Sequence, residues 1–170
     1  MALEDLQQLL TSVNRLFYEN TDESSYATLF FADYDDVTRR LRYVNCGHLP
    51  PLLLRTSQGS SLKQPPVQWL AATCTVLGLF EEWECNIAEV QLVPGDTLVM
   101  YTDGVTEATD GNGEEFGEGR LLETVKNHGD ASPSRLLKTI IEGVQQFGHG
   151  EQADDITSIV ARCRELGSHS

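Results

Sequence analysis

Basic residues are scarce in this chain. Its 170 residues include 12 Lys and Arg against 26 Asp and Glu, which gives a formal net charge of −14 at pH 7. Nucleic acids and anionic membranes repel a surface this acidic, so the charge argues against both as partners. An excess of carboxylates suits a protein that binds divalent cations, although most of these acids are expected simply to be solvated.

Long hydrophobic runs and paired cysteine motifs are also absent. No apolar stretch approaches the ~20 residues of a membrane span, and residues 3–18 carry acids and glutamines where a signal peptide needs an apolar core. The cysteines form no C-x-x-C pair and no zinc-type spacing. We therefore expect a cytoplasmic protein with buried, reduced thiols. The cysteines are Cys46, Cys74, Cys85 and Cys163.

The first half of the chain predicts one helix followed by strands. Apolar residues at helical spacing predict a helix over 3–20. Residues 26–35 and 39–47, joined by an acidic turn whose side chains can accept from their own backbone, predict a β-hairpin. Residues 52–55 predict a further strand, whereas residues 61–76 show no clean period and leave room only for a short strand.

The second half predicts strands, then two helices, then a returning strand. Residues 84–92 and 97–102 predict antiparallel partners joined by a turn. Ser132 and Pro133 mark the start of the second helix as N-cap and first helical residue. This order predicts an α+β fold with helices laid on a face of an antiparallel sheet. We expect a single domain over residues 1–166 and a flexible tail at 167–170.

Two acidic positions flank predicted strands. Asp103 follows the strand at 97–102, and Asp154 and Asp155 precede the strand at 156–164. If these strands are neighbours in one sheet, the carboxylates meet at one edge, and Gly104 lets backbone come close, as at a Mg²⁺ or Mn²⁺ site. The ordinary alternative is that Asp-Gly forms a hairpin turn and Asp-Asp an exposed loop.

Four stretches that follow one another in order resemble a single bacterial family. They are YVNCGHLPPLLLR at 43–55, LVPGDTLVMYTDGVTEA at 92–108, FGEGRL at 116–121 and ADDITSIVARCR at 153–164. Together they resemble the catalytic domain of the stage II sporulation protein E type, within the metal-dependent protein phosphatase 2C class. The resemblance implies a protein phosphatase 2C-like antiparallel β-sandwich flanked by helices, here without the N-terminal strands of the family.

The same resemblance implies a chemistry. Family members hydrolyse phosphoserine or phosphothreonine in proteins with a water activated by two Mn²⁺ or Mg²⁺ ions. Asp103 and Asp154 correspond to metal ligands, and no further catalytic residue is implied. Asp155 corresponds to a position that either replaces a ligand or supports one, and Gly104, which follows Asp103, is placed with it.

A second matched motif concerns structure. Asn45, Gly47 and His48 belong to a recurrent motif of the family, and we expect His48 to hold the turn into the next strand.

Two upstream family motifs, G-D-x-x-D and D-x-x-G-H-G, have no counterpart in residues 1–26. Their aspartates supply the carboxylate that bridges both metals, so the two ligands present would hold one ion weakly. The chain thus resembles the C-terminal two-thirds of a catalytic domain: a fragment, a late gene start at Met1, or a degenerate homologue. The missing strands leave a sheet edge open, which predicts a homodimer or strand-swapped assembly.

We therefore expect a phosphatase domain of a bacterial partner-switching regulator of sigma factors. By family analogy its substrate is a phosphorylated anti-sigma-factor antagonist, and the chain alone is expected to be weakly active or inactive. The alternative is a catalytically inactive phosphatase-like module that binds a phosphoprotein or a regulator. A β-rich domain with no metal site would require four ordered motifs to be coincidence.

Overall fold

The computed structural model describes residues 3–22, 24–56, 66–148 and 155–164. The chain forms two compact units, each made from two segments of sequence. Unit 1 comprises Met1–Pro50 and Leu70–Leu92, and unit 2 comprises Pro51–Trp69 and Val93–Ser170. The single domain expected over 1–166 stays a prediction, and the expected tail at 167–170 lies outside the described residues.

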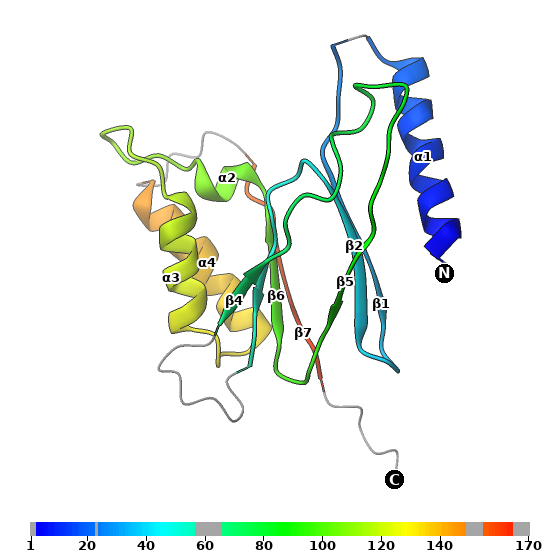
Figure 1. Ribbon diagram of the computed structural model, residues 1–170. Helices are drawn as coiled ribbons and strands as arrows, with labels where there is room; N and C mark the ends of the chain where they lie inside the picture. Colours follow the sequence, from blue (N-terminus) through cyan, green and yellow to red (C-terminus); the bar gives the residue numbers. More distant parts are fainter. Residues whose placement is uncertain (1–2, 23, 57–65, 149–154, 165–170) are drawn as a thin grey trace. The chain divides into compact units, whose positions relative to one another are not determined.

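The described part of unit 1 forms one helix and a three-stranded antiparallel sheet (Figure 1). The helix α1 spans Leu3–Asn20, as its apolar spacing predicts. The strands are β1 (Leu29–Asp35), β2 (Arg40–Cys46) and β5 (Ala88–Gln91), in the spatial order β1-β2-β5. The predicted helix and the predicted strands of the hairpin are confirmed.

The hairpin between β1 and β2 closes as its acidic turn predicts. Its register runs from Leu29 opposite Cys46 to Asp35 opposite Arg40. The carboxylate of Asp35 accepts hydrogen bonds from the backbone N–H groups of Val37 and Thr38, at 2.9 and 3.0 Å. These bonds, the one from Thr38 first, lower the pKa of Asp35, because they favour its charged form.

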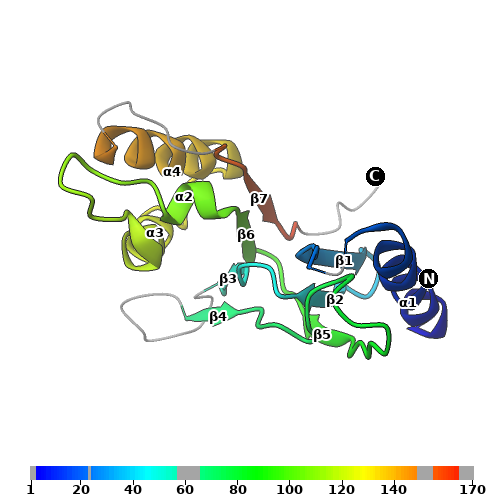
Figure 2. The ribbon, with the colours of Figure 1, turned by 90° about the horizontal axis from the view of Figure 1, so that it is seen from above.

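The core of unit 1 lies between α1 and one face of its sheet (Figure 2). Leu6 and Leu10 of α1 pack with Val44 and Cys46 of β2. Asn14 is also buried on this helix, but it is satisfied: its amide donates to the carbonyl of Phe80 and accepts from the N–H of Gly78. The Asn14 side chain therefore joins α1 to the loop before β5, and its hydrogen bonds offset the penalty of burying a polar group.

Unit 2 contains a four-stranded antiparallel sheet in the order β4-β3-β6-β7. These strands are β3 (Leu52–Leu54), β4 (Val67–Trp69), β6 (Thr97–Tyr101) and β7 (Ser158–Arg162). β6 is central and almost wholly buried, as its apolar composition predicts. The predicted strands at 52–55 and 156–164 are confirmed, and only the short β4 occurs in the described part of the region expected to be irregular.

The described residues of unit 2 form three helices, and the longer two cover one face of its sheet (Figure 2). They are α2 (Asp103–Thr106), α3 (Gly117–Asn127) and α4 (Pro133–Phe147). The hydroxyl of Ser132 accepts from the N–H of Arg135 at 3.3 Å, so the predicted cap of α4 is confirmed. The fully buried side chains of the two longer helices are Leu121, Val125, Leu136, Ile140 and Val144.

Antiparallel sheets flanked by helices confirm the α+β class. None of the helices in the described ranges is long and apolar enough to cross a bilayer.

The predicted antiparallel pairing of 84–92 with 97–102 is wrong. β5 pairs with β2, whereas β6 pairs with β3 and β7 in the other sheet. The turn itself forms, with the N–H of Asp96 bonded to the carbonyl of Val93 and a positive φ at Gly95. The chain passes from one sheet to the other at this turn, and the fully buried carboxylate of Asp96 ties the turn to the residues that follow β3. That carboxylate accepts from the N–H groups of Thr56 and Val93, at 2.8 and 3.0 Å, and pairs with Arg55 at 3.3 Å.

Replacing Asp96 should destabilise the protein strongly. Asp96→Ala removes the acceptor of the Thr56 and Val93 N–H groups and one ion-pair partner of Arg55, so the free energy of unfolding should fall by about 3 kcal/mol. Urea denaturation followed by circular dichroism measures this change. The exposed Asp36 provides the control, because Asp36→Ala should alter stability by less than about 0.5 kcal/mol. Equal effects of the two substitutions would contradict the structural role of Asp96.

Candidate metal site

The pairing of β6 with β7 brings two of the predicted acidic positions to one end of the sheet. Tyr101, the last residue of β6, lies opposite Ser158, the first residue of β7. Asp103 follows this pair by two residues, and Asp155 precedes it by three. Both aspartates are exposed at the same end of these strands. Asp154, the other predicted ligand, lies outside the described residues.

Asp103 begins the short helix α2, so the Asp-Gly pair does not form a hairpin turn. Its carboxylate accepts from the neighbouring N–H of Gly104 at 3.0 Å. Its carbonyl accepts from the N–H of Glu107 at 2.7 Å. The helix carries the chain away from β6 and leaves the Asp103 carboxylate exposed at the junction.

Gly104 packs directly against the backbone of Asp155. A Cβ placed on Gly104 would lie 2.4 Å from the carbonyl oxygen of Asp155 and 2.9 Å from its carbonyl carbon. Real Cβ atoms do not approach backbone this closely, so the contact requires glycine. The absence of a side chain at 104 thus lets α2 and the segment before β7 come together.

Thr102 fastens the same two segments with hydrogen bonds. Its N–H donates to the carbonyl of Thr157 at 3.0 Å, and its hydroxyl accepts from the N–H of Thr157 at 3.1 Å. The hydroxyl also lies 3.3 Å from the carbonyl oxygen of Asp155, to which it can donate. The motifs in the sequence did not indicate this role for Thr102. Its position at the end of a strand could have done so, because threonine hydroxyls there commonly bond to nearby backbone.

Tyr101 is buried beneath this junction and contacts α3. Its hydroxyl donates to a carboxylate oxygen of Glu118 at 3.4 Å. Burial, together with the negative charge of Glu118, raises the pKa of Tyr101, so its hydroxyl stays protonated near neutral pH. The end of β6 is therefore held by α3 as well as by β7.

The Asn45–His48 motif belongs to unit 1, whereas Asp103 and Asp155 belong to unit 2. The side-chain oxygen of Asn45 accepts from the N–H of His48 at 2.9 Å, and its amide donates to the carbonyl of Leu70 at 3.1 Å. Gly47 has a φ of 71°, and a Cβ there would lie 2.7 Å from a methyl of Val76. The His48 ring nitrogen Nδ1 lies 3.4 Å from the hydroxyl of Thr28. These contacts are those of a tight turn.

The donor set at the end of β6 and β7 suits a hard cation but is small. Carboxylate and carbonyl oxygens are the ligands that Mg²⁺ and Mn²⁺ prefer. Within the described ranges, however, no group of three or more Asp, Glu, His or Cys side chains could hold a metal ion. The described residues therefore fit one side of a metal site and not a two-ion centre.

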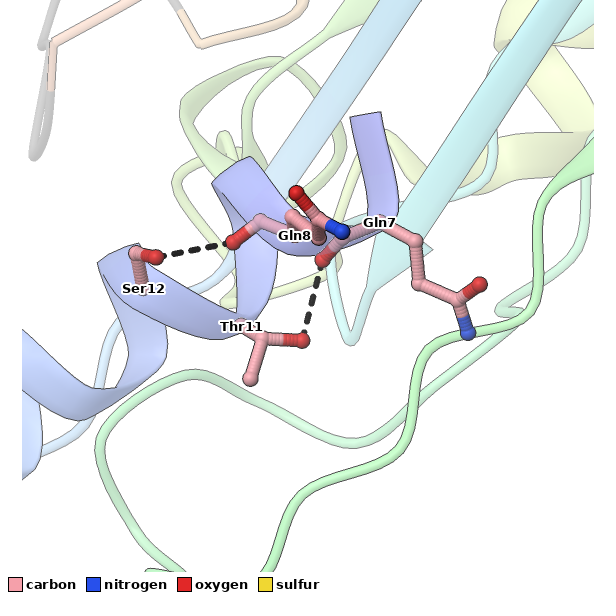
Figure 3. A pocket seen from close by; sticks show the side chains of 4 residues that line it. All are labelled: Gln7, Gln8, Thr11 and Ser12. Atoms are coloured by element: carbon pink, nitrogen blue, oxygen red, sulfur yellow. Dashed lines mark hydrogen bonds between the residues drawn. The ribbon is translucent and has the colours of Figure 1, made fainter. Parts of the chain in front are cut away.

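A hollow of about 530 Å³ lies elsewhere, beside α1 (Figure 3). It is lined by Gln7, Gln8, Thr11 and Ser12, none of which is ionisable. The hydroxyls of Thr11 and Ser12 donate to helix carbonyls one turn back, at 2.9 and 2.8 Å. With its hydroxyls already engaged and no charge available, this hollow offers no hydrolytic chemistry.

Comparison with known proteins identifies the class. Residues 1–164 match the family described as Stage II sporulation protein E (SpoIIE). The chain belongs to this family, as its four ordered motifs predicted.

Individual relatives agree with this assignment. Phosphoserine phosphatase RsbU of Bacillus subtilis is 28% identical over 155 residues, covering 91% of this chain and 44% of RsbU. The SiaA-PP2C domain of Pseudomonas aeruginosa superposes with a TM-score of 0.75 at 19% identity, covering 92% of this chain and 60% of that one. The Mn-presoaked phosphatase domain of SpoIIE from Bacillus subtilis gives a TM-score of 0.64 at 18% identity, covering 100% and 70%.

These structures show that the fold is protein phosphatase 2C-like, as expected. The chain spans less than half the length of the curated relatives it matches.

Adding one methyl group at Gly104 should disrupt the junction. Gly104→Ala forces the backbone of Asp155 away, so the free energy of unfolding should fall by about 2 kcal/mol. Gly119 is the matched control: it lies within α3, a Cβ there meets nothing within 4 Å, and Gly119→Ala should stabilise the protein by about 1 kcal/mol. Thermal and urea denaturation of both variants checks the opposite signs. A Gly104→Ala protein as stable as the parent would show that the close contact is absent.

Proposed function

We propose that this chain belongs to the phosphatase domain of a bacterial partner-switching regulator and acts on phosphoserine or phosphothreonine in a protein. The observation that carries the proposal is the junction at the end of β6 and β7, where Asp103 and Asp155 share one end of the sheet. Support also comes from the family match and from a relative named as a phosphoserine phosphatase.

In this proposal Asp103 and Asp154 hold a Mn²⁺ or Mg²⁺ ion, and Asp155 replaces Asp154 or supports it. When bound, such an ion withdraws charge from a phosphoryl oxygen and lowers the pKa of water. The protein itself contributes by positioning the carboxylates. Gly104 and Thr102 fix the backbone of Asp155 against the start of α2, so that the exposed carboxylate of Asp103 faces solvent from a rigid base.

A complete two-ion centre needs more carboxylates than this junction offers. Two acids cannot neutralise two divalent ions, and Asp5 and Asp22, the described aspartates before β1, match neither of the missing upstream motifs. We therefore propose that the chain alone binds one ion weakly and hydrolyses phosphate esters slowly or not at all. The small number of clustered ligands in the described residues also favours a second candidate, a phosphatase-like module that binds a phosphoprotein without cleaving it.

The partner we propose is a phosphorylated anti-sigma-factor antagonist in the cytoplasm. This assignment follows the analogy with sigma-factor regulators rather than any contact within the chain. The net charge of −14 argues against nucleic acid and anionic membrane as alternative partners.

Replacing Asp103 tests the proposed site. In Asp103→Asn, Mn²⁺ affinity measured by calorimetry should fall by about tenfold or more, because a charged ligand is lost. Any Mn²⁺-dependent hydrolysis of p-nitrophenyl phosphate should disappear with it. Asp130→Asn, at an exposed aspartate between α3 and α4, should leave both unchanged. Mn²⁺ binding that is indifferent to Asp103→Asn would refute the ligand assignment, whereas Asp103-dependent binding without hydrolysis would favour the binding module.

Self-association of the isolated chain is a further expectation. β1 lies at one edge of the sheet in unit 1, and exposed apolar side chains accompany it: Tyr34 is 42% exposed and Val37 76% exposed. Open edges with apolar neighbours tend to pair with another copy. Sedimentation equilibrium should therefore give about twice the 18.9 kDa mass of one chain, as a homodimer or strand-swapped pair. A single species of 18.9 kDa at high protein concentration would contradict this expectation.

A further inference from the structure

Three of the four cysteines meet inside unit 1. The Sγ atom of Cys74 lies 3.2 Å from that of Cys46 and 3.9 Å from that of Cys85. Cys46 ends β2, and Cys74 follows it by 28 residues in the chain, so the fold and not the sequence brings them together. All are thiols in this structure, and the candidate metal site uses none of them.

The parallel β-bridge between Cys46 and Cys74 is compatible with a disulfide between them. The two residues form a parallel β-bridge, and the carbonyl of Asn45 accepts from the N–H groups of Thr73 and Cys74, at 2.9 and 3.3 Å. Adjacent strands lie ~4.8 Å apart, within the ~4.4–6.8 Å range of Cα separations in disulfides. Bonding requires the two sulfurs to approach by only about 1.2 Å, from 3.2 Å to the ~2.05 Å of an S–S bond.

We propose that Cys46 and Cys74 form a redox site, in which a low-molecular-weight disulfide converts the two thiols into an intramolecular disulfide. Cys74 is the entry point because it is partly exposed, whereas Cys46 and Cys85 are 0% and 3% exposed. Cys85 is the less favoured partner, since its sulfur lies farther from Cys74.

The pKa shifts of the two buried thiols agree with this order. Burial raises the pKa of Cys46, and it raises the pKa of Cys85 to about 12. The thiolate is the nucleophile in thiol–disulfide exchange, so neither buried thiol starts the reaction near neutral pH. Cys46 has to ionise only in the second step, when the bonded sulfur of Cys74 is already beside it.

The reaction balances with glutathione disulfide as the oxidant. The thiolate of Cys74 attacks one sulfur of glutathione disulfide, whose S–S bond breaks and releases one glutathione thiolate. The thiolate of Cys46 then attacks the Sγ of Cys74 and expels the second glutathione. The released thiolates take up the two protons given up by the cysteines, and two electrons pass from the protein to glutathione.

The bond would join two segments that already share the Asn45–His48 turn. The strand end of β2 carries Asn45, and the segment around Cys74 carries Thr73, whose hydroxyl accepts from the N–H of Asn45 at 3.1 Å. Closing a 28-residue loop restricts the unfolded chain, so the oxidised protein should unfold at a higher temperature than the reduced one.

The test treats the folded protein with oxidised glutathione at pH 8, alkylates the remaining thiols, and maps the digested protein by mass spectrometry. The expected product has two alkylated cysteines instead of four and contains a peptide linking Cys46 to Cys74. Its Tm should rise by about 5 °C and return to the starting value with dithiothreitol. Cys163→Ser, in unit 2, is the matched control and should form the same bond.

Two variants test the role of each cysteine, and four other products would contradict the proposal. Cys74→Ser should form no intramolecular bond, and Cys46→Ala should keep one glutathione on Cys74. A bond from Cys74 to Cys85, a bond between two chains, a stable glutathione adduct in the parent protein, or four unreacted thiols would each overturn the proposal. Because the parent protein alone gives these results, the test does not depend on the variants folding.

Discussion

The antiparallel register of β6 and β7 is the constraint on which the candidate site depends. It places Tyr101 opposite Ser158, and only this register sets Thr102 against Thr157 and Gly104 against the carbonyl of Asp155. A slip by one residue would turn every side chain of β7 to the opposite face and remove both contacts. The helices α3 and α4, which lie between the strands in sequence, pack over one face of the same sheet and hold the register from outside.

Buried polar side chains organise backbone outside the regular elements in both units, as Asn14 does for Gly78 and Phe80. In unit 1, Asn45 satisfies groups of His48 and Leu70. In unit 2, Asp96 satisfies Thr56, Val93 and Arg55. Turns of irregular geometry leave backbone groups that are buried away from water. The short side chains of Asp and Asn can form hydrogen bonds with these groups. Such residues specify which turn forms, because only that turn satisfies their hydrogen bonds.

Local patterns in the sequence predicted the elements better than their partners. The spacing of Leu6 and Leu10, the acidic turn after β1 and the Ser132 cap each act within a few residues, and all three are confirmed. The partner of β6 was predicted wrongly, because a proline–glycine turn signals a reversal but not the sheet to which the next strand belongs. The cysteine cluster could not be predicted from local patterns either, because its members are distant in sequence. For the candidate site, spacing alone suggested that Asp103 and Asp155 share an edge, and the resemblance supplied their chemistry; the role of Thr102 emerged only from the contacts.

Both units are discontinuous in sequence, and this has a consequence for synthesis on the ribosome. Every residue of unit 1 has been made once the chain reaches Leu92, whereas unit 2 then consists only of the segment that carries β3 and β4. The leucines of β3 are fully or almost fully buried in the finished protein, yet their neighbour β6 has still to be translated. The nascent chain must therefore keep an apolar hairpin from aggregating while later residues emerge. Because β7 is translated last of all the strands, the edge that carries Asp103 and Asp155 is also the last to be assembled.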